Sequence, residues 1–172
     1  MITISIAGVL AAIAIPSFKS SISGNRLTTS TNDMVTALNL ARSEAVKRGK
    51  RVVVRRTVTN WKDGWRVFID ENNDDDYTTT GSNPDTQLRV YSSIPTAISL
   101  TGNTNFVNFV RYMPSGQTSA DGIFVLCDSG AISGAKMIIV NPVGRVQIGS
   151  DADHDNIPEN AGTEITSCTT GF

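Results

Sequence analysis

Acidic residues at alternate positions give this sequence its clearest chemical signal. In the segment DADHDNIPE, residues 151–159, the acids are Asp151, Asp153, Asp155 and Glu159. Carboxylate oxygens spaced in this way around a tight loop are ligands that Ca²⁺ prefers. We therefore predict that these four residues can hold calcium, with a solvated acidic turn as the alternative. We expect no required cofactor, and calcium is the one possible ion.

A second acidic segment lies at residues 70–76, where Asp70, Asn72, Asp74 and Asp76 also alternate. The later segment resembles the DxDxDGIPD pattern of calcium-binding repeats, with Asn156 in the place of the glycine. Asn adopts positive φ more readily than most residues, so the turn remains feasible. Glycines stand at the twelfth position of both segments, where an EF-hand loop has its bidentate glutamate. The later segment is therefore the stronger candidate.

Basic residues are concentrated between residues 42 and 56, although the net charge of the chain is −1. One interpretation is that they complement a helix dipole and cover solvated edges. The other is a patch that contacts the phosphates of DNA. For that patch we predict Lys47, Arg48, Lys50 and Arg51, joined by Arg145 if the last strand lies nearby.

Motifs for catalysis are missing from the sequence. His154 is the only histidine and stands within an acidic loop. The sequence has no nucleophile elbow, P-loop or HExxH pattern. We therefore predict a protein that is not an enzyme, with no catalytic residues and no small-molecule substrate.

The two cysteines, Cys127 and Cys168, are 41 residues apart. Neither has a His or Cys neighbour at zinc-ligand spacing. A pair of this kind behind an apolar N-terminus favours a disulfide formed in an oxidising compartment. The alternative is two separate buried thiols.

The N-terminal stretch MITISIAGVLAAIAIPSF must be placed in apolar surroundings, because 13 of its 18 residues are apolar. It has no basic residues before its apolar core, as a cleavable signal peptide would. The residues up to Ile15 would span only about 22 Å as a helix, less than the ~30 Å of a bilayer core. Either further apolar residues precede this stretch, or it packs into protein.

A helical period continues after this stretch to residue 48. Apolar side chains recur on one face at Leu27, Met34, Leu38, Ala41 and Ala45. We expect Pro16 and Gly24 to interrupt the helix, and Gly49 to end it. The predicted organisation is an apolar helical half at 1–24 and a globular domain at 25–172, made of an amphipathic half at 25–48 and a β-domain at 50–172.

Strand patterns replace the helical period after Gly49. Short Val-, Ile- and Phe-rich segments separated by turn residues indicate antiparallel strands. Asp63-Gly64 between two tryptophans predicts a hairpin turn. The expected strands are residues 51–58, 65–69, 88–91, 98–100, 106–109, 122–127, 136–140 and 144–148. The fold class is α+β, with one long helix packed on antiparallel sheet.

The sequence resembles the type IV pilin-like minor pilins and pseudopilins of the FimT, FimU and GspH group. The resemblance is carried by the apolar start, by NRLTTSTNDMVTALNLARSEAVKRGKRVVV, and by WKDGWRVFID. It continues in GIFVLC and MIIVNPVGRV near the C-terminus. It implies a pilin-like fold and a mature helix whose first residues, with a basic leader, precede Met1.

The resemblance implies a structural role: a minor pilin that primes or joins type IV pilus assembly through its helix. Its partners would be other pilins and, before assembly, the inner membrane of a bacterium, with the domain in the periplasm or outside the cell. The helix residues expected in the membrane or the filament core are Ile4, Ile6, Val9, Leu10, Ile13, Ile15, Pro16 and Phe18.

Two alternatives remain beside the pilus subunit. One is a pseudopilin of a type II secretion system. The other is a minor pilin that binds DNA during natural transformation. Some FimT-like proteins end in a Gly-Arg-x-Arg motif implicated in DNA binding, whereas this sequence reads Gly144-Arg145-Val146-Gln147. The second arginine is absent, which weakens the transfer of DNA binding to this chain.

Overall fold

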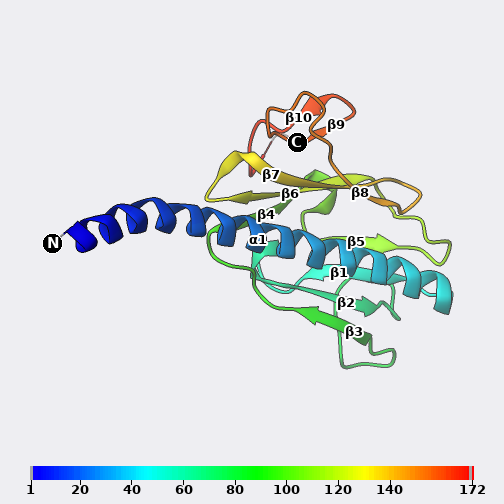
Figure 1. Cartoon of the computed structure of the whole chain (residues 1–172). Coiled ribbons are helices and arrows are strands. Elements are labelled where there is room, and N and C mark those ends of the chain that lie inside the picture. Colours follow the sequence, from blue (N-terminus) through cyan, green and yellow to red (C-terminus); the bar gives the residue numbers. More distant parts are fainter. Residues whose placement is uncertain (1, 171) are drawn as a thin grey trace.

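A single long helix lies along two antiparallel sheets (Figure 1). The computed structural model describes the backbone of residues 2–170 and 172, and the side chains of residues 18, 21–170 and 172. Helix α1 extends from Ile2 to Arg48, and its N-terminal end projects beyond the sheets (Figure 1). The architecture is the predicted α+β fold.

The second half of α1 packs on the sheets through the predicted face. Leu27, Met34, Leu38, Ala41 and Ala45 are all buried. The polar run at 28–31 is a poor helix former, but each of its hydroxyls donates a hydrogen bond to the carbonyl four residues earlier and so has a partner within the helix. The helix ends at Gly49, whose φ of 64° is the left-handed conformation that glycine adopts without strain.

The first sheet follows directly after the helix. Its strand order is β3-β2-β1-β5, and each neighbouring pair is antiparallel. Val52, Val54 and Val67 point from it towards the helix and join the main core. The strands are β1 Val52–Arg56, β2 Trp65–Ile69, β3 Thr86–Tyr91 and β5 Phe109–Tyr112.

The second sheet has the order β4-β6-β7-β8, and its strands are also antiparallel. Phe124, Leu126 and Ile138 face the same core as the helix and the first sheet. Its strands are β4 Ile98–Gly102, β6 Gly122–Asp128, β7 Ala131–Val140 and β8 Val146–Ile148; a small hairpin, β9 Glu159–Asn160 and β10 Thr163–Glu164, follows.

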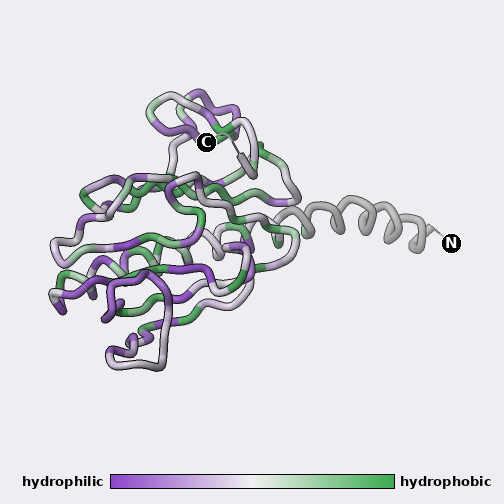
Figure 2. The backbone as a smooth tube through the Cα atoms, turned by 180° about the vertical axis from the view of Figure 1, so that it is seen from behind, coloured by the Kyte–Doolittle hydropathy of each residue, from purple (hydrophilic) through white to green (hydrophobic). Residues whose placement is uncertain are grey.

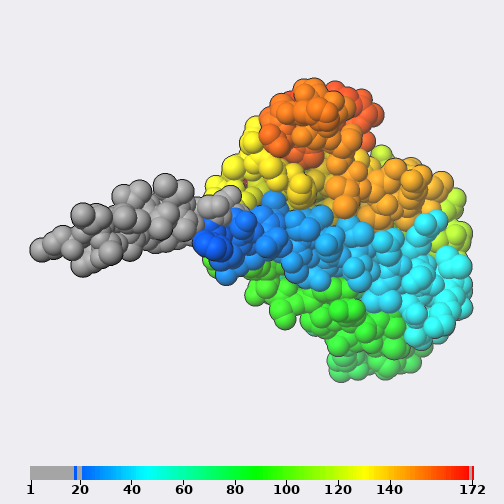
Figure 3. All heavy atoms as spheres, in the orientation of Figure 1, coloured from blue at the N-terminus to red at the C-terminus, as the bar shows by residue number. Residues whose placement is uncertain are grey.

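Each sheet also has a covered outer face. Figure 2 shows hydrophobic stretches in the strands and hydrophilic ones in the loops around them. The loop after β2 shields Val53 and Phe68 on the first sheet, with Tyr77 packed edge-on against Phe68. The C-terminal segment caps the second sheet, as the orange and red atoms of Figure 3 show.

The C-terminal cap is held by a small apolar cluster and a disulfide. Ile165 and Cys168 of the cap pack on Ile123, Val125 and Met137 of the second sheet. The predicted disulfide between Cys127 and Cys168 is present, and it joins the outer face of β6 to the cap.

Two local predictions in the β-domain were wrong. Residues 104–106 form a 3₁₀ turn in which Phe106 is buried, so the strand predicted at 106–109 lies at Phe109–Tyr112 instead. Residues 57–64 join β1 to β2 through a 3₁₀ turn at Trp61–Asp63, which replaces the two-residue hairpin at Asp63-Gly64. Trp61 accounts for both, because its indole N–H donates to the Phe106 carbonyl at 2.7 Å and holds the two turns together.

The predicted interruptions of the helix are absent as well. Helix α1 is assigned without a break from Ile2 to Arg48 and includes both Pro16 and Gly24. A proline removes one backbone hydrogen bond and a glycine none, so the bonds of neighbouring turns can maintain the helix.

Candidate functional site

The first candidate region is the point where α1 leaves its own domain. Ser23 donates a hydrogen bond to the carboxylate of Asp128 at the end of β6. Just before it, Ile22 is 49% exposed and Phe18 is 69% exposed. Among the described side chains of α1, those buried against the domain lie between residues 27 and 45. Large apolar side chains are therefore presented to the surroundings at the edge of the domain.

An open groove of about 410 Å³ lies beside this point. Ile22, Asn25 and Thr29 of α1 form one wall, and the segment 91–95 between β3 and β4 forms the other. Ile94 and Pro95 add apolar surface to the second wall. The edge of the domain thus offers both exposed apolar side chains and a recess next to them.

Most of the residues predicted for the membrane or the filament core lie outside the described side chains. They are Ile4, Ile6, Val9, Leu10, Ile13, Ile15 and Pro16; only Phe18 of that set is described, and it is exposed. Among the residues that the structure describes, no helix combines the length and the apolar content needed to cross a bilayer.

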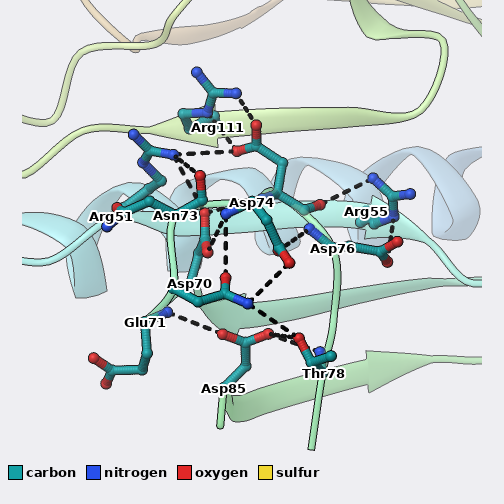
Figure 4. Close-up of polar contacts among 12 residues, drawn as sticks. Arg51, Arg55, Asp70, Glu71, Asn73, Asp74, Asp76, Thr78, Asp85 and Arg111 are labelled. Atoms are coloured by element: carbon teal, nitrogen blue, oxygen red, sulfur yellow. Dashed lines mark hydrogen bonds and ion pairs between the residues drawn. The ribbon is translucent and has the colours of Figure 1, made fainter. Parts of the chain in front are cut away.

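The second candidate region is an arginine and aspartate network on the outer face of the first sheet (Figure 4). Asp75, from the loop after β2, is buried, and its two carboxylate oxygens accept hydrogen bonds from Nε and Nη2 of Arg111. Arg51 lies 3.5 Å from Asp70 and 3.7 Å from Asp75. Arg55 pairs with Asp76 at 3.2 Å. Strand arginines therefore hold the acidic loop onto the sheet.

Asp70 anchors the start of this loop. Its side chain is fully buried, and it accepts the backbone N–H groups of Asp74 and Asp75, each at 3.2 Å. Burial raises the pKa of the Asp70 carboxyl above its usual value, although the backbone N–H groups of Asn73 and Asp74 and the charge of Arg51 act in the opposite direction. Burial likewise lowers the pKa of the Arg111 guanidinium, and nearby Arg51 adds to that effect.

The loop at 70–76 uses its acidic oxygens within the protein. Asp74 accepts the backbone N–H of Asp76 at 2.8 Å and the side-chain amide of Asn72 at 2.8 Å. Asp85, from beyond the loop, accepts the N–H groups of Glu71 and Thr78. The acids that alternate in this segment therefore stabilise turns and pair with arginines, which leaves few free oxygens to converge on an ion.

The later acidic segment differs from this one. Carboxylate oxygens of Asp151, Asp153 and Asp155 all lie within 4.8 Å of one another. No basic side chain pairs with any of them in the part of the chain that the structure describes. One oxygen of Asp151 is shielded from solvent and has no hydrogen-bond partner. Glu159 is turned to the backbone instead, where it accepts the N–H of Ala152 at 2.6 Å.

The electrostatic effect of this segment reaches the neighbouring hairpin. Asp155, followed by Asp153 and Glu159, raises the pKa of the exposed Glu164 carboxyl, because ionising Glu164 adds another negative charge to the group. His154 and Asn156 both have positive φ, at 66° and 68°. The geometry brings three of the four predicted calcium ligands together, and calcium binding itself stays a prediction.

The predicted DNA-contacting residues are largely neutralised by acids of the same chain. Lys47 and Arg48 both pair with Glu44 on the helix, and these pairs lower the pKa of Glu44. Lys50 pairs with Glu71 at 2.8 Å, and Arg51 belongs to the network described above. A patch of free cations at the end of the helix is therefore not what the structure contains.

Arg145 is the member of the predicted patch that pairs with no acid among the described residues. Position 144 requires glycine, because its φ is 78° and an added Cβ would lie 1.9 Å from the Gly116 carbonyl oxygen. Arg42 of α1 donates to the carbonyls of both Gly116 and Val143 at 3.2 Å. The Gly-Arg sequence thus marks a close contact between two loops that α1 clamps together.

Two arginines that the sequence analysis did not single out make distinctive contacts. Arg111 binds Asp75, and Arg66 lies over the ring of Tyr77 at 3.9 Å. Arg56, from the basic run at residues 42–56, donates to the side-chain oxygen of Asn108. Their strand positions were readable from the sequence. Their partners were not, because those partners come from loops and from non-adjacent strands.

Comparison with known proteins places this fold and sequence in a family. The model of the family described as type II transport protein GspH matches residues 30–144. A search of the curated proteins gives no match.

Two crystal structures of the type IV minor pilin FimU from Pseudomonas aeruginosa have a similar fold. In the first, the TM-score is 0.61 at 18% identity, covering 84% of this chain and 96% of that one. In the second, the TM-score is 0.59 at 17% identity, covering 82% and 98%. These similarities establish a pilin-like fold, and the family match covers most of the chain. The chain therefore belongs to the GspH family, the group of minor pilins and pseudopilins.

Proposed function

We propose that this chain is a minor pilin of a type IV pilus that primes or joins filament assembly through its N-terminal helix. One observation carries the proposal: α1 has 47 residues, but among its described side chains those buried against its own domain lie between residues 27 and 45. A helix that extends so far beyond its own packing surface needs apolar surroundings from another molecule.

The edge of the domain supports a role in contacts between subunits. Phe18 and Ile22 are exposed beside a groove of about 410 Å³, so a neighbouring helix could cover them without any change in the domain. Burying such side chains contributes about 1.5–3 kcal/mol each. The apolar sequence before residue 18 adds to this term and, before assembly, would anchor the protein in the inner membrane.

The choice of the pilus over a secretion filament rests on the fold comparison. The two similar crystal structures are of a type IV minor pilin, and the alignment covers nearly the whole of each. The family description, which names type II transport, favours the alternative role of a secretion pseudopilin. The mechanism is the same in either filament, because helix packing and lateral contacts of the domain do the work without turnover.

Deletion of the gene tests these roles in parallel. We expect the deletion strain to lose surface pili, while protein secretion and DNA uptake that do not depend on pili continue. Loss of secretion with normal pili would identify a pseudopilin and contradict the proposal. Loss of transformation alone would favour the DNA-binding alternative.

Complementation with matched variants then locates the function. Ile22→Asp places a charge on the helix at the edge of the domain, and we expect it not to restore pili. Val58→Asp is the control, since Val58 is 62% exposed in the connection between β1 and β2. Both variants should fold, because neither position is buried. Equal rescue by the two would contradict an assembly surface at the helix.

A further inference from the structure

A basic pocket opens at one end of the first sheet, where β1 ends and β2 begins. Its volume is about 440 Å³, within the range of small-molecule sites. Arg55 and Arg56 from the end of β1 line it together with Arg66 from the start of β2. Asp76 and Tyr77 of the loop after β2 complete most of the wall.

Positive charge exceeds negative charge in this pocket. Asp76 is the only acid among its lining residues, and it pairs with Arg55 at 3.2 Å. Arg56 has a neutral partner, the side-chain oxygen of Asn108. Arg66 lies over the Tyr77 ring. Within the described part of the chain, neither Arg56 nor Arg66 has a carboxylate partner, unlike Arg51 and Arg111 on the same sheet.

The arrangement of these arginines is unfavourable without a counterion. Arg55 and Arg66 are directly opposite each other in the register of β1 and β2, and like charges in that position repel. The Nε atom of Arg66 is also shielded from solvent and has no hydrogen-bond partner. A buried N–H group of this kind usually has an acceptor.

We infer that this pocket binds a phosphate-class oxyanion between Arg56 and Arg66. The planar guanidinium group has five N–H donors and binds oxyanions through two parallel hydrogen bonds. An oxyanion held beside the Arg66 guanidinium would offset the repulsion between Arg66 and Arg55. Arg55 and Arg56 belong to the basic run at residues 42–56, whereas Arg66 lies outside it. The inference does not depend on the proposed role in filaments.

Inorganic phosphate titrated into the full chain tests the site directly. The protein would be kept in non-ionic detergent and a low-chloride buffer, with binding followed by calorimetry and by the arginine Nε–H signals in NMR spectra. We expect the Arg66 signal to shift with phosphate and sulfate. A shift of equal size with acetate would overturn the assignment to a tetrahedral oxyanion, and so would the absence of any shift with phosphate.

Matched variants separate a built site from general charge attraction. Arg66→Gln should weaken phosphate binding about tenfold, which corresponds to ~1.4 kcal/mol. Arg89→Gln is the control, because it removes one positive charge from an arginine that also lies over a tyrosine but outside the pocket. Equal weakening by both variants would overturn the inference.

A third variant makes a prediction of opposite sign. Asp76→Asn removes the only acid of the pocket, and it should tighten phosphate binding by a few-fold. Damage to the fold would weaken binding instead, so this variant distinguishes electrostatics from structural disruption. Binding that is unchanged or weaker in Asp76→Asn, with a normal melting temperature, would contradict the proposed site.

Discussion

The two sheets of this domain have their outer faces covered in chemically different ways. On the first sheet, the loop at 70–78 is held by ion pairs from the strands to Asp70, Asp75 and Asp76. On the second sheet, the cap after β8 is held by an apolar cluster around Ile165 and by the Cys127–Cys168 disulfide. Both covering segments are acidic, but only the first is neutralised by its own sheet.

The comparison shows how the same sequence signal can serve different purposes. Alternating acids beside arginine-bearing strands become part of the structure, and their oxygens are occupied by N–H donors. Alternating acids on a cap over the apolar outer face of a sheet also accept backbone N–H groups, but they remain close together without a basic partner among the described residues, which is the condition that favours a cation. The predictions that follow vary one covering segment while the other serves as the reference.

Removal of the disulfide should give the largest effect. Replacing both cysteines with serine releases a loop of about 40 residues, which in the chain-entropy model costs roughly 4 kcal/mol of unfolding free energy. Denaturant unfolding would measure the loss. Hydrogen exchange should show faster exchange in the C-terminal cap, while the loop at 70–78 remains protected. Equal loss of protection in both segments would show that they are not independent.

Asp75→Ala should give the next largest effect. The substitution leaves the guanidinium groups of Arg111 and Arg51 without their shared buried acceptor, and we expect a loss of about 2 kcal/mol. Asp153→Ala is the matched control in the other covering segment, where removal of an exposed acid should change stability by less than about 0.5 kcal/mol. Thermal melts of the two variants measure whether loss of the buried Asp75 costs more stability than loss of the exposed Asp153.

Calcium should stabilise the protein through the C-terminal cap. At about ten times its dissociation constant, an ion that binds only the folded state adds roughly 1.4 kcal/mol. We expect the rise in melting temperature to disappear in Asp155→Asn and to persist in Asp74→Asn. A melting temperature that does not respond to millimolar Ca²⁺ would remove the calcium prediction.

The smallest effect concerns Glu164. Its folded pKa is raised above the usual 4.5. Below the unfolded pKa the Glu164 carboxyl is protonated and is not repelled by its neighbours, so stability is highest there. That stability is lost as pH rises through the folded pKa and the carboxyl ionises. Glu164→Gln should therefore stabilise the protein slightly at about pH 7 and have no effect at about pH 4. Melts at both pH values, without calcium, measure the difference. A destabilising effect at the higher pH would contradict the repulsion.

The sequence predicted those features that depend on local patterns. The helix face from Leu27 to Ala45, the strand at 65–69 and the pairing of the two cysteines follow from period, composition and compartment. Features that depend on non-local pairing were missed. The hydrogen bond from Trp61 to Phe106 explains why one strand begins later, and one turn is longer, than the sequence predicted. No local pattern indicates this bond.

Sequence reasoning failed for the basic residues for the same reason. Lys50 and Arg51 were grouped with a possible DNA patch, whereas the loop after β2 folds back and supplies Glu71 and Asp70 as their partners. Conversely, the repulsive pair of Arg55 and Arg66 arises only from the register of two strands. Charge in a sequence becomes informative once its partners in space are known.

Site-specific photocrosslinking in cells tests the central claim most directly. A photoreactive residue at position 22, where Ile22 is exposed beside the groove, should crosslink to another pilin subunit when pili assemble. The same residue at position 58, on the surface of the β-domain, should give much less of that product. Crosslinks to pilins from position 58 with none from position 22 would contradict assembly through the helix.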